Sequence, residues 1–115
     1  PEQVFKTLVA RGDRYGIHVF CVPVNHELDL KKAAQVTGNK KVDMVPVKDL
    51  LSLTGYIRGG CSPVGMKKKY PTHFDESCKN FDRIAVSAGA RGHQMVVPPV
   101  ALAALVGAEF ANITK

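Results

Sequence analysis

Apolar and β-branched residues form two runs near the start of the chain, and these runs predict a β-hairpin. Residues 3–10 (QVFKTLVA) and residues 15–24 (YGIHVFCVPV) have strand composition, and the turn sequence RGDR separates them. Two short helices are expected next, over residues 28–38 and 46–55, because apolar positions cluster on one side and a glycine follows each. Between them, residues 40–45 (KKVDMV) form either a weak strand or a linker.

The second half of the chain, after a long irregular loop, again has segments typical of strands and helices. Strands are expected at residues 70–75 and 108–113, with a helical turn at 76–81 after the first of them. A second hairpin is expected from RIAVSAG and HQMVVP, joined by ARG, and the apolar residues 98–107 predict a helix that Gly107 ends. No repeat or linker is visible. The pattern therefore predicts one α+β domain over residues 1–115, with a curved mixed β-sheet flanked by short helices.

Charge and cysteine content narrow the possible partners and cofactors. The chain has 16 Lys and Arg against 10 Asp and Glu, a net charge of +6, which suits either a solubilising surface or an anionic partner such as nucleic acid or a nucleotide. Three cysteines without a CxxC pair, and four scattered histidines, fit neither a disulfide framework nor a zinc site. No cofactor is expected. Without a signal peptide or a long apolar run, we expect a cytoplasmic protein and no membrane contact.

The irregular stretch TGYIRGGCSPVGMKKKYP, residues 54–71, concentrates the candidate chemistry. It could be a surface connection whose lysines are merely solvated. It could instead grip an anion, because Gly59 and Gly60 allow close backbone approach and three consecutive lysines follow. A third possibility is a nucleophile at Cys61, which would need a base or a helix N-terminus to lower the pKa of its thiol.

Four segments of the chain, in order, resemble the YbaK/EbsC family of aminoacyl-tRNA deacylases, which is related to the editing domain of bacterial prolyl-tRNA synthetase. They are TGYIRGGCSPVGMKKKYPT, which resembles the family's glycine-rich loop, VFKTLV (4–9), LDLKKAAQVTGNKKVDM (28–44) and VSAGARG (86–92). Family members usually carry a helix and a strand before the VFKTLV segment. This chain lacks them, so we expect the domain and its pocket to be incomplete on that side. Relatives commonly have an aliphatic residue in place of Cys61, which speaks against a nucleophile there.

The resemblance implies a barrel-like editing-domain fold and a trans-editing hydrolase that removes the amino acid from mischarged tRNA, above all Cys-tRNA(Pro). It implies catalytic roles for four residues: Lys6, Gly59, Gly60 and Ser87. Four more would bind the tRNA backbone: Lys67, Lys68, Lys69 and Arg91. The motifs offer no general base, so substrate groups such as the cysteine thiol would assist. The aminoacylated tRNA end and prolyl-tRNA synthetase are the expected partners. The alternative is a non-catalytic module that binds aminoacyl-tRNA or a nucleotide.

Overall fold

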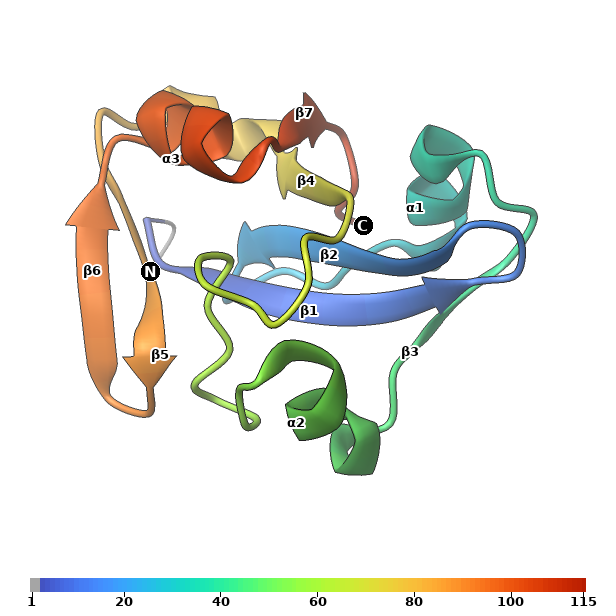
Figure 1. The fold of residues 1–115 in the computed structure, drawn as a ribbon. Coiled ribbons are helices and arrows are strands. Elements are labelled where there is room, and N and C mark those ends of the chain that lie inside the picture. The colour runs from blue at the N-terminus through green and yellow to red at the C-terminus, as the bar shows by residue number, and fades with distance from the viewer. Residues whose placement is uncertain (1–2) are drawn as a thin grey trace.

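The computed structural model describes residues 3–115 and has the predicted N-terminal hairpin at its centre (Figure 1). Strand β1 (Phe5–Gly12) pairs antiparallel with β2 (Gly16–Pro23) along the full length of both strands. All of β2 except Gly16 is buried, because β2 lies between β1 and β4 and other parts of the chain pack on both of its faces. The continuous apolar run in this part of the sequence reflects that central position.

The main sheet has five strands in the order β3-β1-β2-β4-β7. The strand β3 (Val42–Met44) pairs antiparallel with β1, whereas β4 (Thr72–Asp75) and β7 (Glu109–Ala111) add to β2 in parallel. The expected mixed sheet is therefore confirmed. Its two outer strands, β3 and β7, have only three residues each and do not meet, so the sheet is open and not barrel-like.

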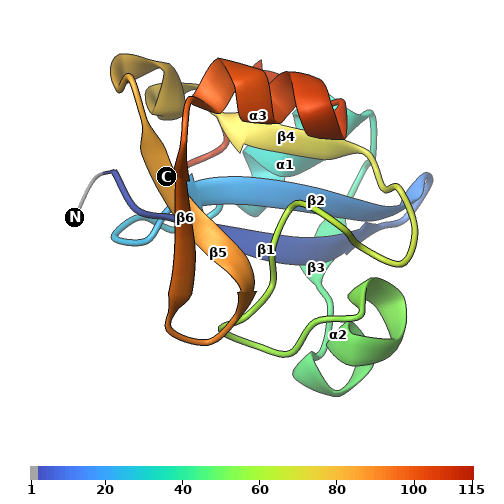
Figure 2. The same ribbon diagram turned by 60° about the vertical axis from the view of Figure 1, so that its left-hand side comes forward.

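The second predicted hairpin forms a separate two-stranded sheet. It consists of β5 (Ile84–Ala90) and β6 (His93–Val97), and it stands across the end of the main sheet (Figure 2). A parallel bridge between Val4 and Ala85 joins its base to the chain just before β1. The backbone N–H of Ala85 donates to the carbonyl of Gln3 at 2.8 Å. This hairpin supplies one wall of the candidate site.

Within residues 3–115, three α-helices and one 3-10 helix pack around the sheet. The helices are α1 (Leu30–Thr37), α2 (Val47–Thr54), η1 (Glu76–Asn80) and α3 (Pro99–Val106). A glycine in the left-handed region ends each α-helix, as the sequence predicted. Helix α1 packs on the face of the sheet that contains Phe20 and Val22, and α3 packs on the opposite face, which contains Cys21 and Phe74. In the part of the chain that the structure describes, no helix is long and apolar enough to cross a membrane.

Candidate active site

A cavity of about 640 Å³ lies along the outer edge of β1. Strand β3 pairs with β1 at residues 10–12, the N–H of Val45 donates to the carbonyl of Val9 at 3.0 Å, and the bridge to β5 is at Val4, so the edge between Val4 and Val9 has no neighbouring strand. The cavity fills this gap, with α2 and the loop 55–71 on one side and the β5–β6 hairpin on the other. Its volume falls in the range of small-molecule sites, about 300–1,000 Å³.

Because the cavity opens onto the edge of β1, residues from both faces of that strand line it. Side chains alternate along a strand, so Lys6 and Leu8 leave β1 on one face and Thr7 and Val9 on the other, yet all four contribute to the wall. Further apolar side chains come from the segment that leads into α2 and from α2 itself: Met44, Val45, Val47 and Leu50. The result is a largely apolar hollow with one lysine from β1 in its wall.

The motifs that are far apart in the sequence meet at this cavity. Lys6 from β1, Gly59 from the loop and Ser87 from β5 all line it. The hydroxyl oxygen of Ser87 accepts a hydrogen bond from the backbone N–H of Gly89 at 3.3 Å, which leaves its own hydrogen free to donate. The structure thus brings three of the four expected catalytic residues together, and their chemical roles stay predictions.

Gly60 is the exception among the four. It is buried and is not among the residues that line the cavity, and its N–H donates to the carbonyl of Ile57 at 3.0 Å. That amide is therefore already used within the loop and does not serve as a donor to substrate in this structure. Among residues 3–115, the N–H of Gly59 has no hydrogen-bond partner, so of these two glycines only Gly59 has an amide free to donate to a substrate.

Cys61 lies in the cavity wall but has the electrostatics of an unreactive thiol. It is buried, and this burial raises its pKa to about 11, although a hydrogen bond with Thr54 acts in the opposite direction. A cysteine nucleophile needs a lowered pKa. The environment of Cys61 therefore argues against the nucleophile hypothesis.

The sequence of most of the chain matches a known protein family. The model of the family described as "Aminoacyl-tRNA editing domain" matches residues 1–105. The chain belongs to this family. It is 52% identical, over 97% of its own length and 68% of the relative's, to EbsC of Enterococcus faecalis, a protein described as a candidate Cys-tRNA(Pro)/Cys-tRNA(Cys) deacylase.

Solved structures agree with this assignment of the editing domain. One described as a candidate trans-editing enzyme for prolyl-tRNA synthetase superposes with a TM-score of 0.90 at 29% identity, covering 99% of this chain and 71% of that one. A hypothetical protein superposes with a TM-score of 0.91 at 20% identity, covering 99% of this chain and 75% of that one, and this second match supports the fold alone.

The loop of this editing domain is held by its own tyrosines and is not a loose connection. The hydroxyl of Tyr56 donates to the carbonyl of Val64, and the hydroxyl of Tyr70 donates to the carbonyl of Leu53 at 2.7 Å. The hydroxyl oxygen of Thr54 accepts from the N–H of Tyr56 at 3.1 Å. These bonds fix the course of an irregular segment that has little regular secondary structure to order it.

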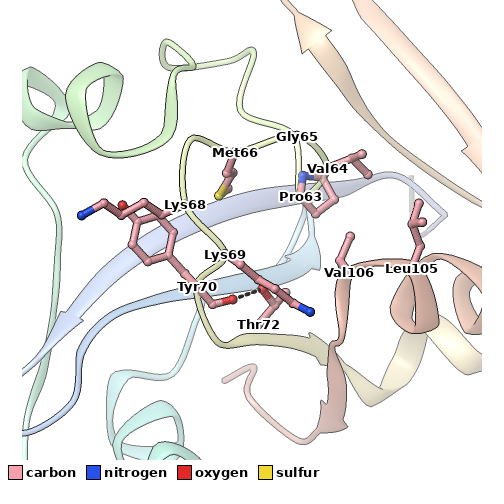
Figure 3. A pocket seen from close by; sticks show the side chains of 10 residues that line it. All are labelled: Pro63, Val64, Gly65, Met66, Lys68, Lys69, Tyr70, Thr72, Leu105 and Val106. Carbon is pink, nitrogen blue, oxygen red and sulfur yellow. Dashed lines mark hydrogen bonds between the residues drawn. The ribbon is translucent and has the colours of Figure 1, made fainter.

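The three lysines of the loop lie outside the main cavity and are exposed. Lys68 and Lys69 border a second, smaller groove of about 280 Å³ between the loop and α3, and their side chains point in opposite directions (Figure 3). They therefore do not converge on one small ligand. Their geometry suits separate contacts with an extended anion.

Three polar residues of the cavity wall were missed at the sequence level: Arg58, His93 and Gln94. Each lies next to a recognised motif, but nothing in the local pattern showed that its side chain would face this cavity. Of these three only Arg58 is positively charged; together with Lys6 it makes the wall basic, and none of the described residues that line the cavity is acidic. His93 also places an ionisable imidazole where the motifs offered no general base. Among residues 3–115, no cluster of three or more His, Cys, Asp or Glu side chains could hold a metal ion.

Proposed function

We propose that this editing domain hydrolyses the ester that links cysteine to the 3′ end of mischarged tRNA(Pro). The observation that carries the proposal is the meeting of Lys6, Gly59 and Ser87 at one basic cavity, whose described lining residues include no acidic side chain. A basic cavity suits a substrate whose end is a nucleotide, and an apolar hollow suits a small side chain. The 52% identity to EbsC supports cysteine as the amino acid.

The chemistry asked of these residues is modest, because an aminoacyl ester is already activated. A water oxygen attacks the carbonyl carbon and gives up a proton, which places negative charge on the carbonyl oxygen, and the unpaired N–H of Gly59 together with the Lys6 ammonium would stabilise that charge. The bond from the carbonyl carbon to the 3′ oxygen then breaks, and the ribose 3′ oxygen takes up a proton. The free hydroxyl hydrogen of Ser87 would orient the ribose or the amino group.

Two sources of proton transfer are compatible with this cavity. The substrate's own thiol can assist the attack, as the resemblance implies, or His93 can act as a general base from the wall. If the thiol assists, the rate should fall when the esterified amino acid has no thiol. If His93 assists, the rate should fall when His93 is replaced.

The rest of the tRNA would lie on the exposed basic residues outside the cavity. Lys67, Lys68, Lys69 and Arg91 can contact phosphates without reading bases. The proposal includes recruitment by prolyl-tRNA synthetase and a place in the cytoplasm, where aminoacyl-tRNA is used. The resemblance of the fold to a candidate trans-editing enzyme for that synthetase supports the first point.

The test is single-turnover deacylation of tRNA(Pro) charged with cysteine, 2-aminobutyrate, alanine or proline. We expect Cys-tRNA(Pro) to be hydrolysed at least tenfold faster than the 2-aminobutyryl ester, which has nearly the same shape but no thiol. Equal rates for these two esters, together with loss of rate in His93→Ala, would show that His93 and not the substrate thiol transfers the proton. If no ester is hydrolysed above the spontaneous rate, the protein is a binding module and not a deacylase.

A further inference from the structure

At the tip of the β5–β6 hairpin, Arg91 contacts the loop 55–71. This residue lies in the turn between the two strands, and its guanidinium Nε donates a hydrogen bond to the backbone carbonyl of Arg58 at 2.8 Å. The two residues are far apart in sequence, so this bond ties together two separate walls of the cavity.

The same two segments approach each other so closely that a side chain at Gly59 or Gly60 would make unusually tight contacts. A Cβ on Gly59 would lie 3.3 Å from Nε and 3.4 Å from Cγ of Arg91, and Gly59 also has a φ of +83°. A Cβ on Gly60 would lie 3.3 Å from the Cα of Ala90 and from the backbone N of Arg91. The hairpin tip therefore packs directly against the backbone of Gly59 and Gly60, where no side chain intervenes.

The contact of Arg91 with the loop lies at the end of the hairpin where it can affect the position of Ser87. The hairpin is joined to the start of β1 at its base, through the bridge between Val4 and Ala85, while Arg91 is at its opposite end. Ser87 lies on β5 between these two attachments and faces the cavity that Gly59 also lines. The separation of Ser87 from the Gly59 amide therefore depends on whether the tip is held.

We propose that Arg91 is a positioning residue that fixes the Gly59 amide opposite Ser87, in addition to any contact of its charge with tRNA. This inference rests on the proposed function for its kinetic consequence, but the contact itself can be tested without it. Arg91 does not line the cavity, so any effect on the chemical step, as distinct from tRNA binding, passes through the loop that it holds. Small misplacements of reacting groups are costly for rate, up to about 100-fold for 1 Å.

The kinetic test compares Arg91→Lys and Arg91→Ala with the control Arg83→Ala, an exposed arginine at the base of the same hairpin. Each variant is assayed on Cys-tRNA(Pro) and on the cysteinyl ester of adenosine, which has no phosphate. We expect both Arg91 variants to lose about 10- to 100-fold in kcat on both substrates, with KM on the adenosine ester changed less than about threefold. Lysine keeps the charge but has no Nε–H at the position of this bond. Arg83→Ala should match the parent.

A purely electrostatic role gives the opposite pattern and would overturn the proposal. Arg91→Lys would then match the parent, and Arg91→Ala would raise KM for tRNA while leaving the adenosine ester unaffected. A second measurement is independent of turnover: hydrogen exchange at the amides of Gly59 and Gly60, read by NMR. We expect exchange at the Gly60 amide, which donates to Ile57, to accelerate at least tenfold in Arg91→Lys and not in Arg83→Ala. Unchanged exchange refutes the positioning role even if the parent proves inactive, whereas an inactive parent with accelerated exchange refutes only the proposed function.

Discussion

Replacement of Cys61 by alanine should leave the deacylase rate nearly unchanged, although this residue lines the cavity. Burial raises the pKa of the thiol from its ordinary value of 9.0 to about 11. At pH 7.5 a pKa of 11 leaves roughly one thiol in 3,000 ionised, against about 3% for a pKa of 9. A nucleophile needs the thiolate, so burial lowers its population about 100-fold.

Two measurements test this conclusion. In single-turnover assays with Cys-tRNA(Pro), Cys61→Ala should keep its rate within about threefold of the parent, because only a sulfur atom is removed from the wall. Alkylation by iodoacetamide, followed by mass spectrometry for each cysteine, should be slow at pH 7.5 and rise about tenfold per pH unit towards pH 11. Burial raises the pKa of Cys21 and Cys78 to about 12, so these residues should be modified more slowly still.

A loss of about a thousandfold in Cys61→Ala, the scale seen when a catalytic group is removed, would refute an unreactive Cys61. Fast alkylation of Cys61 at pH 7, in step with loss of activity, would refute it as well. Either result would mean that the cavity lowers the pKa of the thiol during the reaction. A cysteine hydrolase would then be the better description.

Four further predictions concern charge, close packing and pH. Lys6→Ala should keep tRNA binding within about threefold but lower the single-turnover rate at saturation by at least 100-fold; weakened binding with an unchanged rate would reverse its role. Replacing the three lysines at 67–69 by alanine should weaken tRNA binding and reduce the slope of log K against log salt by about 0.7–0.9 per lost phosphate contact, with the saturated rate unchanged. Gly60→Ala should lower the rate about tenfold or more, because its Cβ would lie only 3.3 Å from the Cα of Ala90 and displace the hairpin backbone. An unchanged rate would show that the hairpin can move away without cost to the reaction. Burial lowers the pKa of His18 and of His73 below 6.5, so the unfolded state binds more protons, and the free energy of unfolding should fall as pH drops below about 6.5. Urea titrations at pH 5, 6 and 7 should show this, and a flat profile would contradict it.

The elements that are determined by local pattern were predicted well from the sequence. The first hairpin was expected at residues 3–10 and 15–24 and is found at Phe5–Gly12 and Gly16–Pro23. The helix ends at Gly38, Gly55 and Gly107 were all predicted, because a glycine in the left-handed region terminates a helix whatever surrounds it. These features depend on residues that are close in the chain.

Long-range pairing was not predictable in the same way. Nothing in THFD or EFA indicates that these strands pair in parallel with β2 and with each other, and the open edge of β1 follows from where β3 and β5 stop pairing. The site residues came from the order of motifs that resemble a family, which is why Lys6 and Ser87 were found. Arg58, His93 and Gln94 were not, because only the assembled cavity shows that they line it.

The bridge between Val4 and Ala85 has a consequence for when the protein becomes active during its own synthesis. The strand that carries Lys6 and the strand that carries Ser87 are separated by about 80 residues of chain, or roughly 4–16 s of translation at about 5–20 residues per second. In that interval the β1–β2 hairpin can already form, but the outer edge of β1 has no hairpin beside it and no second wall. The nascent chain therefore passes through a period in which the cavity lacks its second wall, and deacylation cannot begin before Ser87 has left the ribosome.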